Sequence, residues 1–204
     1  MDACAKQFHV DKWATQEFRP EVWIEKDALV GVIEGVCEEL DVSYFSCRGY
    51  TSQSEMWVAS QRLLKYKKND GQMPVILHFG DHDPSGMDMT RDIVDRLELF
   101  TRGSVEVNRL ALNTDQVDTY KPPPNPAKVT DSRAAAYIQK FGTESWELDA
   151  LEPNVIVALI RNNVTGFMDK KKWEDAVAEE EAERVSLGKV ADRWSDIQTF
   201  LEVE

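Results

Sequence analysis

The sequence is short of several features that would point to a particular class of protein. Its three cysteines, Cys4, Cys37 and Cys47, do not have the spacing of a metal site. No apolar run approaches the ~18 residues of a membrane span, and the first 13 residues lack the apolar core of a signal peptide. We therefore expect a cytoplasmic protein with reduced thiols and no membrane contact.

Positive charge is also scarce. The 24 lysines and arginines are outnumbered by 37 acidic residues, which gives a net charge of -13. This balance excludes a broad basic surface for nucleic acid, but it leaves room for a protein that meets phosphates through metal ions and a few local cations. Part of the acidic excess lies in residues 176–183 (AVAEEEAE), where we expect a solvent-exposed helix face.

The most informative stretch of the chain is residues 74–86 (PVILHFGDHDPSG). It begins as a short apolar run that is typical of a buried strand. Turn residues then stop the strand and hold Asp81 and Asp83 at its carboxyl end. In open α/β sheets, ligands bind at the carboxyl ends of the strands. Two carboxylates with few basic residues nearby suit a hard divalent cation such as Mg2+.

Strands and helices alternate around this stretch. We expect strands at 21–25, 42–47, 74–79 and 105–112, and intervening helices at 29–40, 52–66 and 87–100. This order predicts an α/β fold with a central, mostly parallel sheet that is flanked by helices and joined by right-handed crossovers.

Helices are also expected at the two ends of the chain. The sequence predicts a helix over residues 3–18, and further helices over 154–169, 170–187 (ended by Gly188) and 191–201. The resulting organisation is an N-terminal helix (1–20), an α/β domain (21–165) and a helical C-terminal extension (166–204). The chain opens without a clear start to a fold, which leaves open that it is a C-terminal piece, or a short relative, of a longer protein.

A third acid is expected to join the aspartate pair. Glu25 follows the first strand as Asp81 follows the third. The carboxyl ends of parallel strands face the same way, so Glu25, Asp81 and Asp83 converge if the two strands are close neighbours. Such a group would hold one or two Mg2+ ions for work on a phosphodiester, with Glu25 as a ligand or a general acid/base. The alternative is that the aspartates only cap a turn and a helix.

A strand ending in Glu, followed by a strand ending in Asp-x-Asp, resembles the Toprim domain of topoisomerases, bacterial primases and small nucleases. Residues 80–86 (GDHDPSG) look like the Asp-Gly-Asp-Pro-Tyr-Gly signature of the type IIB topoisomerase (topoisomerase VI) A subunit and related double-strand-break proteins. Residues 146–151 (WELDAL) look like an acidic segment near the end of that Toprim domain. The resemblance covers about residues 21–165.

The resemblance implies a Toprim-like, Rossmann-like fold and metal-dependent chemistry on DNA phosphodiesters. It makes Glu25, Asp81 and Asp83 the catalytic and metal-binding acids, with Glu147 and Asp149 as weaker candidates. The implied cofactor is Mg2+ or Mn2+, and the implied partner is DNA.

Two departures from the family pattern stand out. Position 82 is histidine rather than the usual small glycine, and we expect the His82 side chain to point to solvent. The tyrosine-bearing domain that cleaves DNA in that branch is missing, since only twenty residues precede Glu21 and none of them is tyrosine. The nucleophile would therefore be water, or would come from another domain or a partner subunit. The oligomeric state is open, a homodimer included.

Four cations are weak candidates for binding phosphate at the same edge of the sheet: Lys26, Arg48, Lys128 and Arg133. The competing reading of each is an ordinary surface charge.

Two other functions remain open from the sequence. The first is a catalytically inactive Toprim module that binds a partner protein or DNA in a larger complex, which the net charge of -13 favours. The second is a phosphatase of the haloacid-dehalogenase type. That chemistry needs a nucleophilic first aspartate with Thr or Val two residues beyond the pair, and Ser85 stands there instead.

Overall fold

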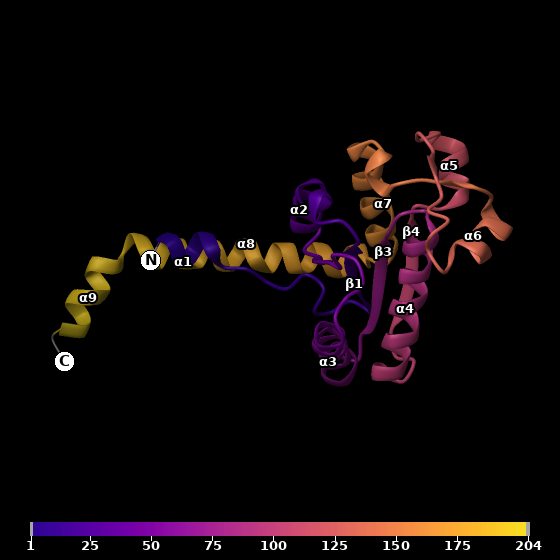
Figure 1. The fold of residues 1–204 in the computed structure, drawn as a ribbon. Helices are drawn as coiled ribbons and strands as arrows, with labels where there is room; N and C mark the ends of the chain where they lie inside the picture. The colour runs from indigo at the N-terminus through magenta and orange to yellow at the C-terminus, as the bar shows by residue number, and fades with distance from the viewer. Residues whose placement is uncertain (1, 203–204) are drawn as a thin grey trace. The chain divides into compact units, whose positions relative to one another are not determined.

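The computed structural model describes residues 2–202. Its contacts divide the chain into two units (Figure 1). One is the α/β unit, residues 17–167, and the other joins the N-terminal residues up to 16 with residues from 168 onward. None of the helices within residues 2–202 combines the length and the apolar character that crossing a bilayer requires.

The α/β unit is built on a four-stranded sheet with the order β2-β1-β3-β4, in which every pairing is parallel. The strands are β1 (Phe18–Ile24), β2 (Ser43–Ser46), β3 (Met73–Phe79) and β4 (Glu106–Ala111). The predicted parallel α/β fold is therefore confirmed, and the architecture is Rossmann-like. Chain order reverses direction between β1 and β3, which makes the carboxyl ends of these two strands the switch point of the sheet.

Helices cover both faces of the sheet. They are α2 (Val30–Glu39), preceded by the short helix η1 (Asp27–Leu29), α3 (Gln53–Asp70), α4 (Pro84–Thr101) and α7 (Pro153–Gly166). Trp23 and Ile76 pack into a core with α3 and α4, whereas α2 and α7 pack against each other. Neighbouring positions on the opposite face, Leu77 and Phe79, are fully buried as well, as expected for a parallel sheet that is covered on both sides.

The chain from β4 to α7 forms smaller elements. These are α5 (Thr114–Tyr120), β5 (Asn125–Pro126), α6 (Ala134–Phe141), β6 (Glu144–Ser145) and η2 (Leu148–Ala150). The two-residue strands β5 and β6 pair in an antiparallel manner. Helix α5 begins with a capping box between Asn113 and Gln116.

The helix predicted over residues 3–18 is wrong. Helix α1 covers only Asp2–Gln7, and β1 begins at Phe18. Between them, Trp13 is buried edge-on against Trp173, at 5.8 Å between ring centroids, and the Gln16 side chain exchanges two hydrogen bonds with the backbone of Asp169. Packing against the C-terminal helix thus replaces the local helical preference of this segment.

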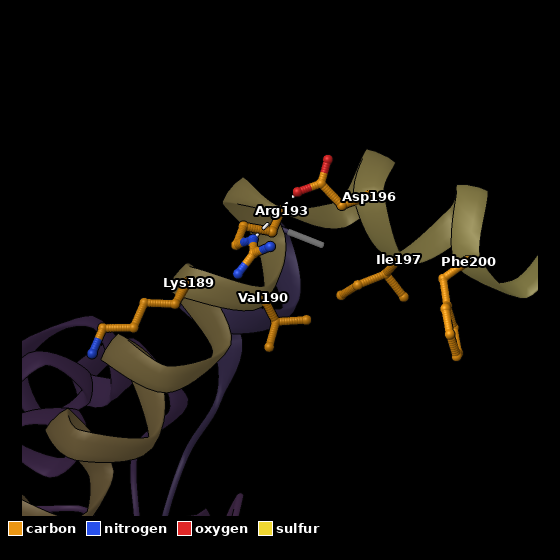
Figure 2. A pocket seen from close by; sticks show the side chains of 6 residues that line it. All are labelled: Lys189, Val190, Arg193, Asp196, Ile197 and Phe200. Carbon is orange, nitrogen blue, oxygen red and sulfur yellow. Dashed lines mark hydrogen bonds and ion pairs between the residues drawn. The ribbon is translucent and has the colours of Figure 1, made fainter.

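The C-terminal helices also differ from expectation. Helix α8 (Lys170–Asp192) continues through Gly188, where an end was predicted, and α9 (Trp194–Glu202) follows. Figure 2 shows the corner between them, where Val190, Ile197 and Phe200 line a hollow beside the Arg193–Asp196 ion pair.

The acidic segment 176–183 is not wholly a solvent-exposed face. Glu180 is buried and accepts hydrogen bonds from the Val10 backbone and the Lys12 ammonium, both at 2.9 Å, while Arg184 pairs with its other oxygen. Glu180 therefore joins the N-terminal segment to α8 within this unit.

Candidate functional site

Glu25 and Asp81 meet at the switch point of the sheet, because β1 and β3 are adjacent. The backbone N–H of Glu25 donates to the Phe79 carbonyl at 2.9 Å, which continues the pairing one residue beyond the strand. The Glu25 Oε2 atom in turn accepts from the backbone N–H of Asp81 at 2.8 Å. The predicted convergence of the two strand ends is confirmed.

Each aspartate uses one carboxylate oxygen to hold the local backbone. Asp81 Oδ1 accepts from the Leu148 N–H at 2.7 Å, and Asp83 Oδ1 accepts from the Gly86 N–H at 2.6 Å as the N-cap of α4. Asp83 thus caps α4, as the capping interpretation expects, and whether it has a further role is not decided by this contact. Within residues 2–202 the second oxygen of each aspartate accepts no hydrogen bond.

The acidic segment Glu147–Asp149 lies at the same edge. Lys26 Nζ is 2.7 Å from Glu147 Oε2, 3.0 Å from Asp149 Oδ1 and 3.5 Å from Asp81 Oδ1. Burial lowers the pKa of the ammonium, but the bonds to Glu147 and Asp149 and the charge of Asp81 outweigh it, so the pKa is raised. Of the four cations predicted to bind phosphate, Lys26 is the one that contacts these acids.

The other three predicted cations have separate surroundings. Arg48 pairs with Asp27 at 2.7 Å. Arg133 pairs with Asp131 and Asp88 and lies over the Tyr50 ring. Lys128 is exposed, and no ion pair involves it in the part of the chain that the structure describes.

Arg109 on β4, which is not among the predicted site residues, lies beneath the turn that carries the aspartates. Its guanidinium donates to the carbonyls of Gly80, Asp81, Gly86 and Leu112, at 2.6 to 3.2 Å. Burial lowers its pKa to about 10, although the three nearby carboxylates oppose that shift. Arg109 therefore fixes the backbone of the turn and counters its negative charge from below.

The carboxylates crowd one another. Burial, followed by the charge of Asp81 and more weakly that of Asp83, raises the pKa of Glu25 to about 7, although the hydrogen bond from Asp81 and the charge of Arg109 lower it. Burial also raises the pKa of Asp81, against the Leu148 hydrogen bond and the charge of Lys26. Such a site gains free energy from an additional cation.

The titration of Glu25 gives a testable pH dependence. The pKa of Glu25 is about 7 in the folded protein, whereas its ordinary value is 4.5. Between pH 4.5 and pH 7, Glu25 is therefore mostly protonated in the folded protein and mostly ionised in the unfolded chain. This contribution stabilises the fold at low pH and is lost as the pH rises through 7, by up to about 3 kcal/mol. We expect Glu25→Gln to gain stability relative to wild type, by up to that amount, between pH 5 and pH 8 in urea unfolding.

The matched control for this prediction is Glu98→Gln, a change at an exposed acid of α4 outside the site. Glutamine at position 25 keeps the acceptor for the Asp81 N–H, so a difference in stability that is the same at both pH values would contradict the raised pKa.

The chemistry of the donor set fits a hard divalent cation, since Glu25, Asp81 and Asp83 offer only carboxylate oxygens. The placement of the side chains is looser than a preformed cage: within residues 2–202, no three His, Cys, Asp or Glu side chains are grouped to hold one metal ion. The candidate ligands are therefore brought to one edge of the sheet without closing around a single point.

The prediction that His82 points to solvent is wrong. The ring is 1% exposed and lies edge-on to Tyr137, Phe141 and Trp146. Nδ1 lies 2.8 Å from the Tyr137 hydroxyl, and Nε2 lies 3.2 Å from the Thr114 hydroxyl. His82 also exchanges backbone hydrogen bonds with Trp146, which fixes the acidic segment beside Asp81.

We expect His82→Ala to lower the free energy of unfolding by about 3 kcal/mol, because it removes a buried ring and leaves the Tyr137 hydroxyl without its ring nitrogen. His82→Phe keeps the aromatic packing and should lose about half as much. Chemical denaturation measures both. A cost below about 0.5 kcal/mol for the alanine variant, which is typical of surface changes, would show that the ring is exposed in solution.

These features define a Rossmann-like α/β domain with an acidic edge at its switch point. No protein-family model matches the chain, and no curated protein matches it significantly.

Proposed function

We propose that the chain performs metal-dependent chemistry on DNA phosphodiesters, as a Toprim-type nuclease or as the Toprim half of a topoisomerase VI A-like DNA-cleaving protein. The observation that carries the proposal is the meeting of Glu25 with Asp81 at the switch point, two positions before Asp83, in a site whose carboxylates repel one another. The resemblance in residues 80–86 and 146–151 supports the same function.

In this proposal Glu25, Asp81 and Asp83 hold Mg2+ or Mn2+, which when bound polarises a phosphodiester and stabilises the leaving oxygen. The alternative role of Glu25 is that of a general acid/base, which a pKa of about 7 suits close to neutral pH. Arg109 keeps the aspartate turn in place, and Lys26 meets phosphate at the edge. The attacking group is water, or a nucleophile from another domain or partner subunit.

Cleavage of supercoiled plasmid and of single-stranded DNA with Mg2+ or Mn2+ tests the proposal. The comparison is a double Asp81→Asn, Asp83→Asn variant, since asparagine keeps the acceptors for the Leu148 and Gly86 N–H groups while it removes both charges. Asp95→Asn, at an exposed acid of α4, is the matched control.

Metal-dependent cutting that is lost only in the double variant supports a stand-alone nuclease. Metal binding without cutting supports a protein that depends on a nucleophile from elsewhere. The absence of both metal binding and cutting contradicts the proposal.

A second candidate function is a catalytically inactive module that binds a partner protein or DNA. Three observations favour it. Lys26 already pairs with acids of the candidate site, and the described acids do not form a closed cage. In addition, Phe200 is 66% exposed at the hollow between α8 and α9 (Figure 2). Tight partner binding that survives the Asp81→Asn, Asp83→Asn exchange would support this function.

A further inference from the structure

Helices α3 and α4 leave an open groove between them on the α/β unit. The groove has a volume of about 390 Å3, and its apolar lining comes from Trp57 and Leu64 on α3 and Phe100 on α4. Trp57 lies edge-on to Phe100, at 5.4 Å between ring centroids, and is 50% exposed. Half-exposed tryptophans of this kind are common anchors of protein–protein interfaces.

The charge of this groove is opposite to that of the whole chain. The charged side chains that line it are the cations Lys68 and Arg102, whereas the net charge of the chain is -13. Two further cations, Lys65 and Lys67, flank Lys68 on α3. All four are exposed, and none forms an ion pair in the part of the chain that the structure describes. The groove therefore combines an apolar floor with positive charge that is not neutralised, which suits an acidic, partly apolar ligand.

The chain itself carries a helix face of this chemistry. On α8, Glu174, Val177, Glu181 and Val185 recur at intervals of three or four residues, so they lie along one face of the helix. The valines are 42% and 47% exposed, and the two glutamates are exposed without an ion pair among residues 2–202. Glu180, which binds the N-terminal segment, lies on a different side of the helix.

The groove and the helix face also match in length. The α3 side of the groove runs from Trp57 to Lys68, and the α8 face runs from Glu174 to Val185. Both spans cover eleven positions of a helix, or about 16 Å. The apolar and charged groups of the two surfaces can therefore lie opposite one another along their whole length, as in other helix-in-groove contacts.

We infer that the exposed face of α8 in one copy of the chain binds in the α3–α4 groove of a second copy. The two glutamates then face the cations of the groove, and the two valines cover its apolar floor. The contact joins two different surfaces, so two copies form a closed dimer if it is made twice, and longer assemblies form if it is not. This inference goes beyond the proposed function, because none of the residues involved belongs to the acidic edge.

Sedimentation velocity of the full chain over a range of concentrations, at low ionic strength, tests the inference. The groove variant is Lys68→Glu, Arg102→Glu, which reverses both charges of the lining. The matched control is Lys128→Glu, Lys140→Glu, which changes the net charge by the same amount at exposed positions outside the groove. The helix variant, described next, reverses the charges of the opposite surface.

The helix variant is Glu174→Lys, Glu181→Lys. We expect the wild type and the control to associate as the concentration rises. In the groove variant and in the helix variant, like charges face each other, so the dissociation constant should rise at least about tenfold. An equimolar mixture of these two variants should associate again, because each surface then meets a partner of opposite charge.

A wild type that stays monomeric at every concentration would overturn the inference, as would association that the groove variant retains or a mixture that does not associate. Ionic strength gives a second readout that needs no variant and therefore no variant that folds. Wild-type association should weaken as salt is added, because the paired charges are exposed. Association that salt leaves unchanged would contradict the pairing of these surfaces.

Discussion

Replacing Arg109 with methionine should lower the free energy of unfolding by about 3 kcal/mol. The substitution keeps the apolar stem but removes the donors that reach the Gly80, Asp81, Gly86 and Leu112 carbonyls. It also removes the charge that opposes the crowded carboxylates from below. Urea unfolding at neutral pH measures the loss.

The control for this prediction is Arg91→Met, at an exposed arginine of α4 that pairs with Asp88 and Asp95. Surface ion pairs contribute little, so we expect almost no change. Lys at position 109 keeps the charge but reaches fewer acceptors, and Arg109→Lys should fall between wild type and Arg109→Met. Equal stability of the Arg109→Met and Arg91→Met variants would show that the guanidinium does not hold the turn.

Gly86→Ala should lower the free energy of unfolding by roughly 3 kcal/mol, because the added methyl group overpacks the site. A Cβ atom at this position would lie 2.3 Å from the Asp81 carbonyl oxygen and 3.0 Å from the Asp81 nitrogen. The backbone of Asp81 cannot easily move away, since Arg109 binds its carbonyl and Glu25 binds its N–H. The methyl group would therefore push the start of α4 away from the turn.

Gly31→Ala is the matched control, because a Cβ there meets nothing within 4 Å. Gly31 lies in α2, where alanine favours the helix by up to ~1 kcal/mol. The two substitutions should therefore shift the denaturation midpoint in opposite directions. A Gly86→Ala variant as stable as the wild type would mean that α4 does not begin so close to Asp81.

The sequence predicts the sheet and the placement of Glu25 and Asp81 because both depend on local signals. The buried strands are short apolar runs bounded by turn residues, and the carboxyl ends of adjacent parallel strands necessarily share an edge. The adjacency of β1 and β3 does not depend on local signals. The sequence predicts that Glu25 and Asp81 converge only if these two strands are neighbours, and in the structure they are.

The roles of His82 and Arg109 could not be predicted in the same way. The ring contacts of His82 come from Tyr137, Phe141 and Trp146, more than fifty residues along the chain, and nothing near position 82 signals them. Strand alternation places Arg109 on the same face as Val105 and Val107, but nothing in the sequence indicates which groups its guanidinium reaches. Only the fold shows that it points beneath the aspartate turn.

The helix predicted for the N-terminal segment is wrong for a related reason. Residues 8–17 have no strong helix breaker, so a helix was the simplest prediction. The observed turns follow from tertiary contacts of Trp13 and Gln16 with residues more than 150 positions later. The acidic segment shows the same limit, since the partners of Glu180 lie at the other end of the chain.

The most direct test of the acidic edge as a divalent-cation site is calorimetric titration of Mg2+ at pH 6.5, in two buffers with different ionisation enthalpies. With the Glu25 pKa at about 7, most of that carboxyl group is protonated at this pH, so a bound cation must displace the proton. We expect binding accompanied by proton release in the wild type, and neither in the Asp81→Asn, Asp83→Asn variant. Absence of binding in the wild type, or binding that the double variant retains without proton release, would contradict the assignment of the site.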